Sequence, residues 1–560
     1  MKRLLILTVV LLWFLTPGVY GQVSIVPSIH PVYDWLHQQR IEGRLYEFEY
    51  EDLPVTRGKV VRFLKEIQTV EGELSYADQF TLDAYLKEFD PDYLKERNEY
   101  GFFTTERPLI ERIKYFLEPY NERQWVSIDD SSVGINGAFD IQLGQATLSG
   151  ENGSDTYSSY INYRGIRGYA TFQDIVGLHL EAQNVSGNGD LFALEQDDFW
   201  GPSETVERQR KNTANYYEAF LTVKKGIASF DIGRGSLRIG PGVNSSILLS
   251  ETAPNFNWLR LKFHSKRIRY TALHGSLYAR PNDTFVIVGQ DTARTRIAPE
   301  RWIVMHRLSL KPIKQVQIAV TEMLTYSNRV ADLSYLNPVA PIFISELENS
   351  DRDNAFLALD VVAQPIPKVE VFATLLIDDL ISFSDILQDE ATRDDDVALN
   401  VGFLTALPFS SQFAFGYTRL EPFVYTHWQR LNTFEQRGRS LGHYLGPNAD
   451  ELEFRFTKWL PYRAWIQFAY RNVRKGFNPV DENGNLVRNV GGDLLIGSNN
   501  AGFIMFQDAD LSAWHELEFG GQIEPFRGVV LSANIVERNV FNGTRADNFR
   551  LIDLRFQLGF

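Results

Sequence analysis

Residues 551–560, with the sequence LIDLRFQLGF, indicate the fold of this 560-residue chain. Counted back from Phe560, every second residue is apolar, and the residues between them are polar or small as far as Asp553. A period of two is typical of a β-strand whose two faces differ. One apolar and one polar face suit a strand that separates lipid from a wet lumen. We therefore predict that the chain ends as a strand of a membrane-spanning β-barrel.

The same alternation recurs upstream, from about residue 125 onwards. It is clear at 139–143, 229–232 and 452–456, and Asn-Gly pairs typical of hairpin turns are frequent. Long polar stretches at 184–215, 384–397 and 476–500 suit extracellular loops. At roughly 22–27 residues per strand with its connection, residues 125–560 hold about 16–20 strands, and an even number near 18 keeps both ends on the periplasmic side.

The N-terminus is predicted to be a signal peptide over residues 1–21. Lys2 and Arg3 precede an apolar run from Leu4 to Leu15, which is short for a membrane span. Small or tolerated residues before Gln22 suit cleavage at that point. An uncleaved N-terminal anchor is the alternative.

Residues 22–122 show apolar residues at helical spacing instead. We expect helices that begin near Pro31, Thr56 and Ser75, and one more from Tyr93 to about Phe116. The predicted fold is therefore mostly β: a transmembrane antiparallel β-barrel of about 18 strands over 125–560, preceded by a small periplasmic α-helical bundle over 22–122.

Composition excludes several classes of function. The chain has no cysteine, which excludes disulfides, a thiolate nucleophile and Cys-ligated zinc. A formal net charge of −15 without a basic stripe argues against nucleic-acid binding. No phosphate-binding loop, His-Glu-x-x-His motif or complete dinucleotide motif occurs, so we expect neither a metal nor a cofactor.

Four tryptophans near strand ends are expected in interfacial girdles, namely Trp302, Trp428, Trp459 and Trp514.

Several segments in order along the chain resemble the Wzi family of capsule-assembly proteins. They are Gly233–Gly242, Ser246–Ser250 with Ala253-Pro254, His306-Arg307-Leu308, Glu322, Tyr335–Pro338, Asp378-Asp379, Gly416–Pro422 and Leu441–Asp450. The resemblance spans most of the predicted barrel. It rests on the ordered combination, because each segment alone is weakly specific.

The resemblance implies an outer-membrane barrel with the helical bundle at its periplasmic end. It further implies a lectin-like, non-catalytic protein that binds and anchors capsular or extracellular polysaccharide at the cell surface. Outer-membrane lipid and lipopolysaccharide are expected as further partners. A terminal aromatic such as Phe560 also resembles the signal that barrel-assembly machinery reads in the last strand.

Five residues are candidates for contact with glycan: Arg234, Arg238, Asp378, Asp379 and Glu421. The fork of an arginine matches a carboxylate, so a lumen-facing pair could meet a uronic acid. Arg234 and Arg238 are four residues apart and would share one face of a single strand. An internal ladder of ion pairs across the lumen is the alternative for both arginines, and we favour it. The acidic candidates are expected at strand ends or in loops.

Two other functions stay open from the sequence. One is a porin-like outer-membrane channel with the bundle as a helical plug. The other is an outer-membrane hydrolase that assembles a Ser-His pair from distant strands. The first depends on whether the lumen is open, and the polar stretches at 184–215 and 476–500 could close its outer mouth.

Overall fold

The computed structural model describes residues 22–70, 74–90, 102–103, 105–117, 125–130, 135–152, 155–190, 194, 213–280, 285–288, 294–349, 353–378, 396–497, 509–543 and 545–559. The predicted signal peptide, Asp379 and Phe560 lie outside these residues.

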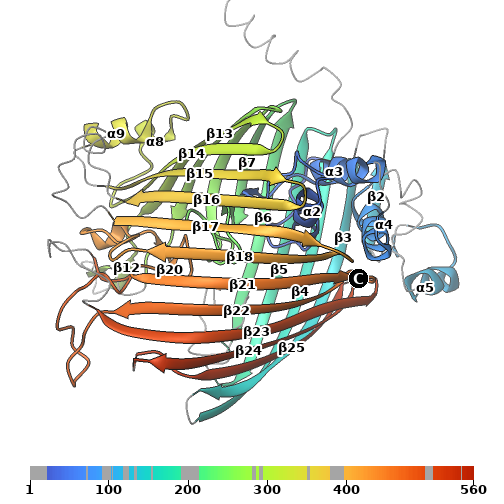
Figure 1. Cartoon of the computed structure of the whole chain (residues 1–560). Helices are drawn as coiled ribbons and strands as arrows, with labels where there is room; N and C mark the ends of the chain where they lie inside the picture. The colour runs from blue at the N-terminus through green and yellow to red at the C-terminus, as the bar shows by residue number, and fades with distance from the viewer. Residues whose placement is uncertain are drawn as a thin grey trace, which may run out of the picture.

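Eighteen antiparallel strands form a closed barrel, as predicted (Figure 1). In chain order they are β3 (Ile135–Asn152), β4 (Asp155–Phe172), β5 (Val176–Gly189), β6 (Thr213–Lys225), β7 (Ala228–Gly235), β9 (Phe256–His264), β10 (Ile268–Leu277), β13 (Arg301–Ile313), β14 (Val316–Ser327), β15 (Asn354–Ile366), β16 (Val369–Asp378), β17 (Asp396–Leu407), β18 (Ser411–Leu420), β21 (Ala449–Leu460), β22 (Ala464–Phe477), β23 (Asp510–Phe526), β24 (Val529–Asn542) and β25 (Phe549–Gly559). The last strand closes the ring on the first, with Leu558 opposite Leu143. A further strand, β2 (Val126–Asp130), pairs with the first residues of β3, beyond the end of β25.

The two ends of the barrel differ in their connections. Turns of a few residues join the strands at one end, for example at 173–175 and 461–463. Long connections such as 236–255 and 421–448 lie at the other end. Short periplasmic turns and long extracellular loops are typical of outer-membrane barrels, so the long-loop end is the outer one.

Along the strands of the wall, exposed apolar side chains alternate with buried ones, as the sequence predicts for the last strand. On β25, Leu554 and Phe556 are 52% and 41% exposed, whereas Asp553, which precedes Leu554 and lies on the opposite face, is buried. Large apolar side chains are likewise exposed on the outer face of the other strands, as a lipid-facing belt requires.

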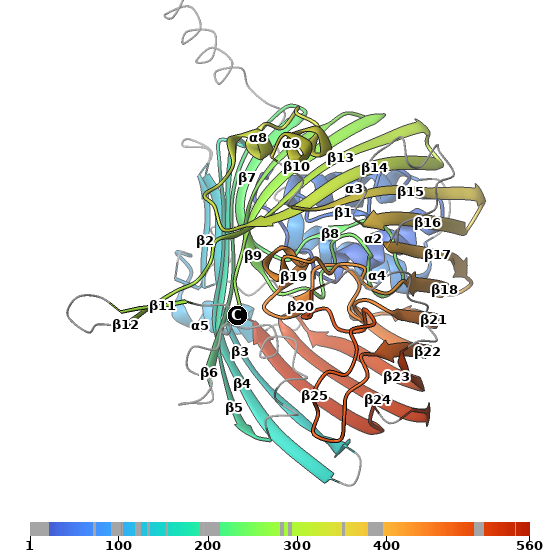
Figure 2. The ribbon, with the colours of Figure 1, turned by 90° about the vertical axis from the view of Figure 1, so that its left-hand side faces the viewer.

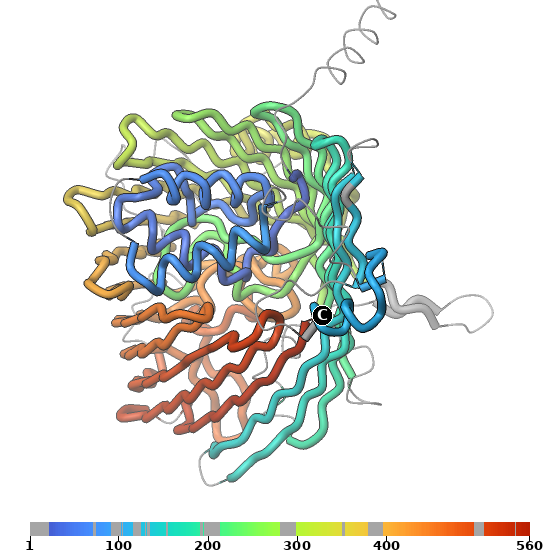
Figure 3. Tube along the Cα trace, turned by 90° about the vertical axis from the view of Figure 1, so that its right-hand side faces the viewer, coloured from blue at the N-terminus to red at the C-terminus, as the bar shows by residue number. Residues whose placement is uncertain are grey.

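A helical bundle fills the inner, short-turn end of the lumen (Figure 3). It consists of α2 (Val32–Ile41), α3 (Arg57–Thr69) and α4 (Tyr76–Phe89), whose apolar faces form one core. The Ser75 hydroxyl accepts a hydrogen bond from the Asp78 backbone N–H and so caps α4, as expected. Of the helix expected over 93–116, the described residues show only α5 (Leu109–Leu117). Among the described helices, none combines the length and hydropathy needed to cross a bilayer.

Buried ion pairs attach the bundle to the wall. Arg40 of α2 pairs with Glu370 of β16, and Asp52 pairs with Lys262 of β9 at 2.6 Å. Glu88 of α4 pairs with Arg463 at 2.8 Å, in the turn between β21 and β22. Trp459 is also buried in the bundle core, so its expected place in a lipid-facing girdle is wrong. The Trp459 ring faces the lumen because the bundle offers it an apolar surface there.

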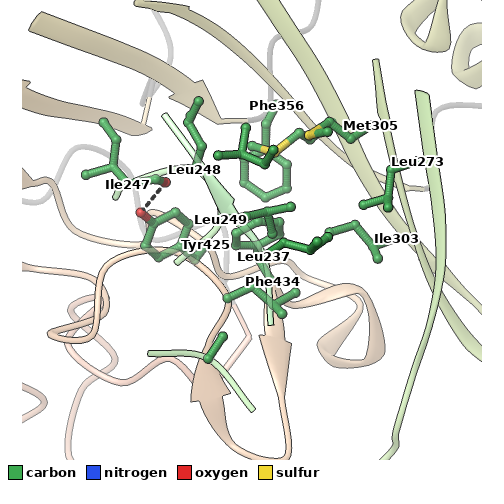
Figure 4. Packing of buried hydrophobic residues seen from close by; sticks show 14 of the residues in the cluster. Leu237, Ile247, Leu248, Leu249, Leu273, Ile303, Met305, Phe356, Tyr425 and Phe434 are labelled. Carbon is green, nitrogen blue, oxygen red and sulfur yellow. Dashed lines mark hydrogen bonds between the residues drawn. The ribbon is translucent and has the colours of Figure 1, made fainter. Parts of the chain in front are cut away.

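The connections 236–255 and 421–448 fold into the outer half of the lumen, where we call them the plug (Figure 2). The plug contains β8 (Arg238–Ile239), which pairs with β1 (Asp52–Leu53) of the bundle region, as well as η4 (Arg430–Asn432), β19 (Glu435–Gln436) and β20 (Arg439–Ser440). Leu237, Leu249 and Phe434 pack there against wall residues such as Met305 and Phe356 (Figure 4). The lumen is therefore not wet throughout, because loop side chains supply an apolar partner for the inward face of the wall.

Other outer-end elements complete the described chain. They are the hairpin β11 (Phe285–Val288) and β12 (Arg294–Ile297), and the short helices α8 (Leu333–Leu336) and α9 (Ile342–Glu348) in the connection between β14 and β15.

Candidate functional site

Wall residues hold the plug by hydrogen bonds to its backbone. Asp378, the last residue of β16, faces the lumen and accepts a hydrogen bond from the Tyr425 backbone N–H. The Tyr425 hydroxyl in turn donates to the Ile247 carbonyl at 2.7 Å, which joins the two connections (Figure 4). Arg301 of β13 donates to the carbonyls of Leu431 and Thr433. Buried backbone groups of the plug are thus satisfied by the wall.

Arg238 lies inside the plug, where 1% of its side chain is exposed. Its guanidinium donates to Glu251 and to the Gly242 carbonyl, and it stacks 4.3 Å from the Tyr50 ring centroid. This is the internal ion pairing favoured from the sequence, although the partner belongs to the plug and not to the opposite wall. Arg238 therefore supports the plug from within.

Arg234 and Arg238 do not share a strand face, and that expectation is wrong. The chain leaves the wall after Gly235, so Arg238 belongs to β8 within the lumen. Arg234 has the same parity as the exposed Phe230 and Ile232 and so lies on the outer face of β7. Its guanidinium stacks between the rings of Tyr217 and Tyr278, at 4.5 and 5.4 Å from their centroids.

Glu421 lies directly after β18, at a strand end as expected. Its carboxylate accepts two hydrogen bonds of 2.9 Å from the guanidinium of Arg419. Asp379 lies outside the described residues.

A cavity of about 930 Å³ opens above the plug, at the outer mouth of the barrel. We call it the mouth cavity. Its lining comes from the plug, from the outer ends of β22 and its following loop, and from the connection between β24 and β25: Asn244, Thr252, Gly438–Ser440, Tyr444–Pro447, Lys475, Phe477, Asn478, Val480, Gly484, Leu486, Gly492–Ile496 and Arg545.

The mouth cavity is cationic in an acidic protein. Its lining includes three basic residues, Arg439, Lys475 and Arg545, and one carboxylate, Asp493, whereas the whole chain carries a net charge of −15. Lys475 donates its ammonium protons to the carbonyls of Leu445 and Pro447 and so fixes the rim. The side chains of Arg439 and Arg545 are exposed, and the Arg545 guanidinium lies 5.8 Å from the centroid of the Phe477 ring, which also lines the cavity.

Tyr444 presents an aromatic face at the same rim. Its side chain is 40% exposed, but its hydroxyl is turned inward and donates to the Glu451 carboxylate. Burial of that hydroxyl and the neighbouring Glu451 raise the pKa of Tyr444 well above its usual value, so the phenol stays protonated. A ring held at its hydroxyl end is a rigid surface for the C–H face of a sugar.

None of the four candidates that the structure describes, namely Arg234, Arg238, Asp378 and Glu421, lines the mouth cavity. The lining residues come from four separate connections, and no local pattern in one connection predicts that the others lie beside it. One signal was present: the segment Leu441–Asp450, which carries part of the family resemblance, forms the rim with Tyr444 and Pro447.

Comparisons with known proteins agree with this barrel fold. Residues 78–518 match the family described as capsule assembly protein Wzi. No curated protein matches the chain in sequence. Among solved structures, Wzi of Escherichia coli, described as an outer membrane protein involved in group 1 capsule assembly and a carbohydrate-binding β-barrel, has 11% identity over 95% of this chain and 99% of that chain, with a TM-score of 0.57.

Two barrels of Pseudomonas aeruginosa are less similar. OpdK has 9% identity over 76% of this chain and 98% of that chain, with a TM-score of 0.43. OccK8 has the same identity, coverage and TM-score. The family match covers well over half of the chain and agrees with the outer-membrane barrel described above. This protein belongs to the Wzi family of capsule assembly proteins.

Proposed function

We propose that this protein binds capsular or extracellular polysaccharide and anchors it at the cell surface, and that the glycan is held in the mouth cavity. The observation that carries the proposal is a large cavity with cationic and aromatic lining at the outer end of a closed barrel. Sugar recognition needs planar hydrogen-bonding groups and an aromatic face, and this rim supplies both. The cavity's cations favour a glycan with carboxylate groups.

The proposed role is binding without catalysis. The two histidines of the plug, His427 and His443, are buried rather than presented to the cavity. Burial lowers the pKa of His427 to about 4, so its imidazole is neutral near pH 7. His443 lies beside Glu451, beneath the rim. These environments suit structural histidines better than a general base that meets substrate.

A closed lumen favours binding over the porin-like alternative. The apolar plug fills the outer half, and the bundle fills the inner half. The residues that close the outer half are 236–255 and 421–448, whereas the sequence pointed to 184–215 and 476–500. Of those two stretches, 478–497 packs at the mouth and 195–212 lies outside the described residues.

Further partners follow from the placement in the outer membrane. We propose that the bundle faces the periplasm, because it lies at the short-turn end. The lipid-facing belt would contact outer-membrane lipid and lipopolysaccharide. The strand that ends the chain would be read by the barrel-assembly machinery.

Deleting the gene tests the anchoring role. We expect high-molecular-weight polysaccharide to pass from the cells into the medium while its synthesis continues. Cells that keep their surface glycan unchanged would overturn the proposal.

Variants of the rim test the site itself. The double variant Arg439→Ala/Arg545→Ala should weaken binding of the cell's purified surface polysaccharide about tenfold, because it removes two charged hydrogen-bond donors. Arg488→Ala is the matched control, since Arg488 is an exposed arginine of the same loop region that does not line the cavity. Equal binding by both variants would place the glycan elsewhere.

A further inference from the structure

On strands β3 to β6, the side chains on the outer face of the wall change from apolar to polar towards the outer end of the barrel. Leu143 pairs with Arg164, Arg164 pairs with Asn184, and Asn184 pairs with Asn215, so these four side chains form one row on the outer face. The next row towards the periplasm contains Ile141, Ile166, Ala182 and Tyr217. The apolar belt therefore ends, on this side of the barrel, at the row of Arg164.

A groove of about 620 Å³ runs along this boundary. Its floor is formed at the small side chain of Ala182, and Leu143, Ile166, Leu180 and Tyr217 surround it. These four side chains are 38–44% exposed, as expected of a surface that contacts hydrocarbon. Arg164, Asn184 and Asn215 line the outer end of the same groove.

Arg164 has no ionic partner in the part of the chain that the structure describes. Another arginine of the outer face is paired: Arg550 lies 3.4 Å from Glu537 on the neighbouring strand. An unpaired arginine on a lipid-facing wall is costly unless an anion meets it. Beside Arg164, the side-chain amide of Asn184 donates a hydrogen bond of 2.9 Å to the side-chain oxygen of Asn215. This bond holds the two side-chain amides, with their remaining N–H donors, next to Arg164.

We propose that this groove binds one lipopolysaccharide molecule through its lipid A. A phosphate of lipid A would meet Arg164 and the amide pair, and an acyl chain would lie over Ala182. The groove opens towards the long-loop end, where the outer leaflet lies, and it continues the lipid-facing belt without a break. The site rests on the outer-membrane placement and is separate from the mouth cavity, so its failure leaves the glycan proposal untouched.

The test uses the full chain in detergent, titrated with bisphosphorylated lipid A and followed by native mass spectrometry. Arg164→Gln should weaken lipid A binding about tenfold, the usual loss for one charge-assisted hydrogen-bonding group. Arg550→Gln is the matched control, because it removes an arginine from the outer face that already has a partner. Polysaccharide binding in the mouth cavity should be unchanged in both variants.

A second variant and two further lipids make the outcome decisive. Ala182→Phe fills the groove and should also lower lipid A binding, with the heat-dependent gel mobility of the barrel showing that it is folded. Dephosphorylated lipid A should bind as weakly to the wild-type chain as lipid A binds to Arg164→Gln. Phosphatidylglycerol that binds as tightly as lipid A, or variants that bind like the wild type, would overturn the proposal.

Discussion

Arg40 lies between two buried carboxylates, one in the bundle and one in the wall. Its Nη2 atom is 2.6 Å from Glu51 Oε1 and 2.5 Å from Glu370 Oε1. All three side chains are almost fully buried, so none can exchange its partner for water. Removing one member of such a group leaves uncompensated buried charge, which costs about 3–5 kcal/mol.

Arg40→Met should therefore loosen the bundle from the wall. We expect amide hydrogen exchange in α2 to become at least about a hundredfold faster, since about 3 kcal/mol corresponds to that factor. Adding Glu370→Gln to the variant should recover part of the protection, because it removes one of the orphaned charges. Unchanged exchange in α2 would show that the bundle is held by its apolar contacts alone.

Glu88 links the stability of the bundle to pH. Burial alone would raise the pKa of Glu88, but the guanidinium groups of Arg463 and Arg527 outweigh it and hold that pKa well below its usual range. A carboxyl whose pKa is lower in the folded state stabilises the fold above its unfolded pKa, about 4.3. That contribution is lost as pH falls through the lower, folded value.

Glu88→Gln should consequently lower the urea midpoint of the bundle at pH 7 but not in strong acid. The measurement is near-ultraviolet circular dichroism at several pH values between 7 and 3. The curves of the variant and the wild type should converge as the pH falls below about 4. A constant difference over the whole range would assign the effect to packing and not to charge.

At the scale of elements, the loop after β22 supports the plug from above. Gly491 has a φ of +67°, and a Cβ atom there would lie 2.4 Å from the Phe423 backbone nitrogen. Gly226, in the turn between β6 and β7, has a φ of +59°, yet a Cβ atom at that position would meet nothing within 4 Å and the residue does not line the mouth cavity. The two glycines share their backbone conformation and differ in what surrounds them.

This pair separates backbone strain from contact with the plug. Both Gly491→Ala and Gly226→Ala should cost about 1–2 kcal/mol for the left-handed conformation. Only Gly491→Ala should also displace the segment around Phe423 and weaken polysaccharide binding in the mouth cavity, measured by titration with purified glycan. Equal binding by the two variants would mean that the site tolerates movement of the plug.

For the whole molecule, closure of the lumen is the property that separates a binding protein from a channel. The plug and the bundle occupy the lumen at two levels, each with its own apolar core. We expect the purified chain to give no steady ion current in a planar bilayer. A stable ohmic current would show that water and ions pass both cores, and it would revive the porin-like alternative.

Much of the barrel could be predicted from the sequence, because lipid imposes a local rule on each strand. The even number of strands follows instead from placing both ends of the barrel on the periplasmic side. The alternation at 551–559 follows from the local rule, and Ser75 marked a helix start in the same local way. These features depend on neighbours in the chain. The helices and the wall could therefore be assigned without knowing how the elements meet.

The lumen and the site could not be predicted, because they depend on where connections fold. Gly235 ends β7 and sends Arg238 inward, and this separates two arginines that spacing alone places on one face. Trp459 is buried only because the bundle lies behind it. The residues of the mouth cavity come together from distant connections, so no single stretch reveals them.

The attachment points of the bundle are spread around the ring. Arg57 stacks 3.8 Å from the Tyr169 ring on β4, Lys262 pairs from β9, Glu370 from β16 and Arg463 from the turn after β21. The bundle thus connects distant strands of the ring across the inner end of the lumen. A hollow cylinder of this size can flatten into an oval under lateral pressure, whereas a braced one keeps its cross-section, and with it the shape of the opening on the opposite side of the membrane.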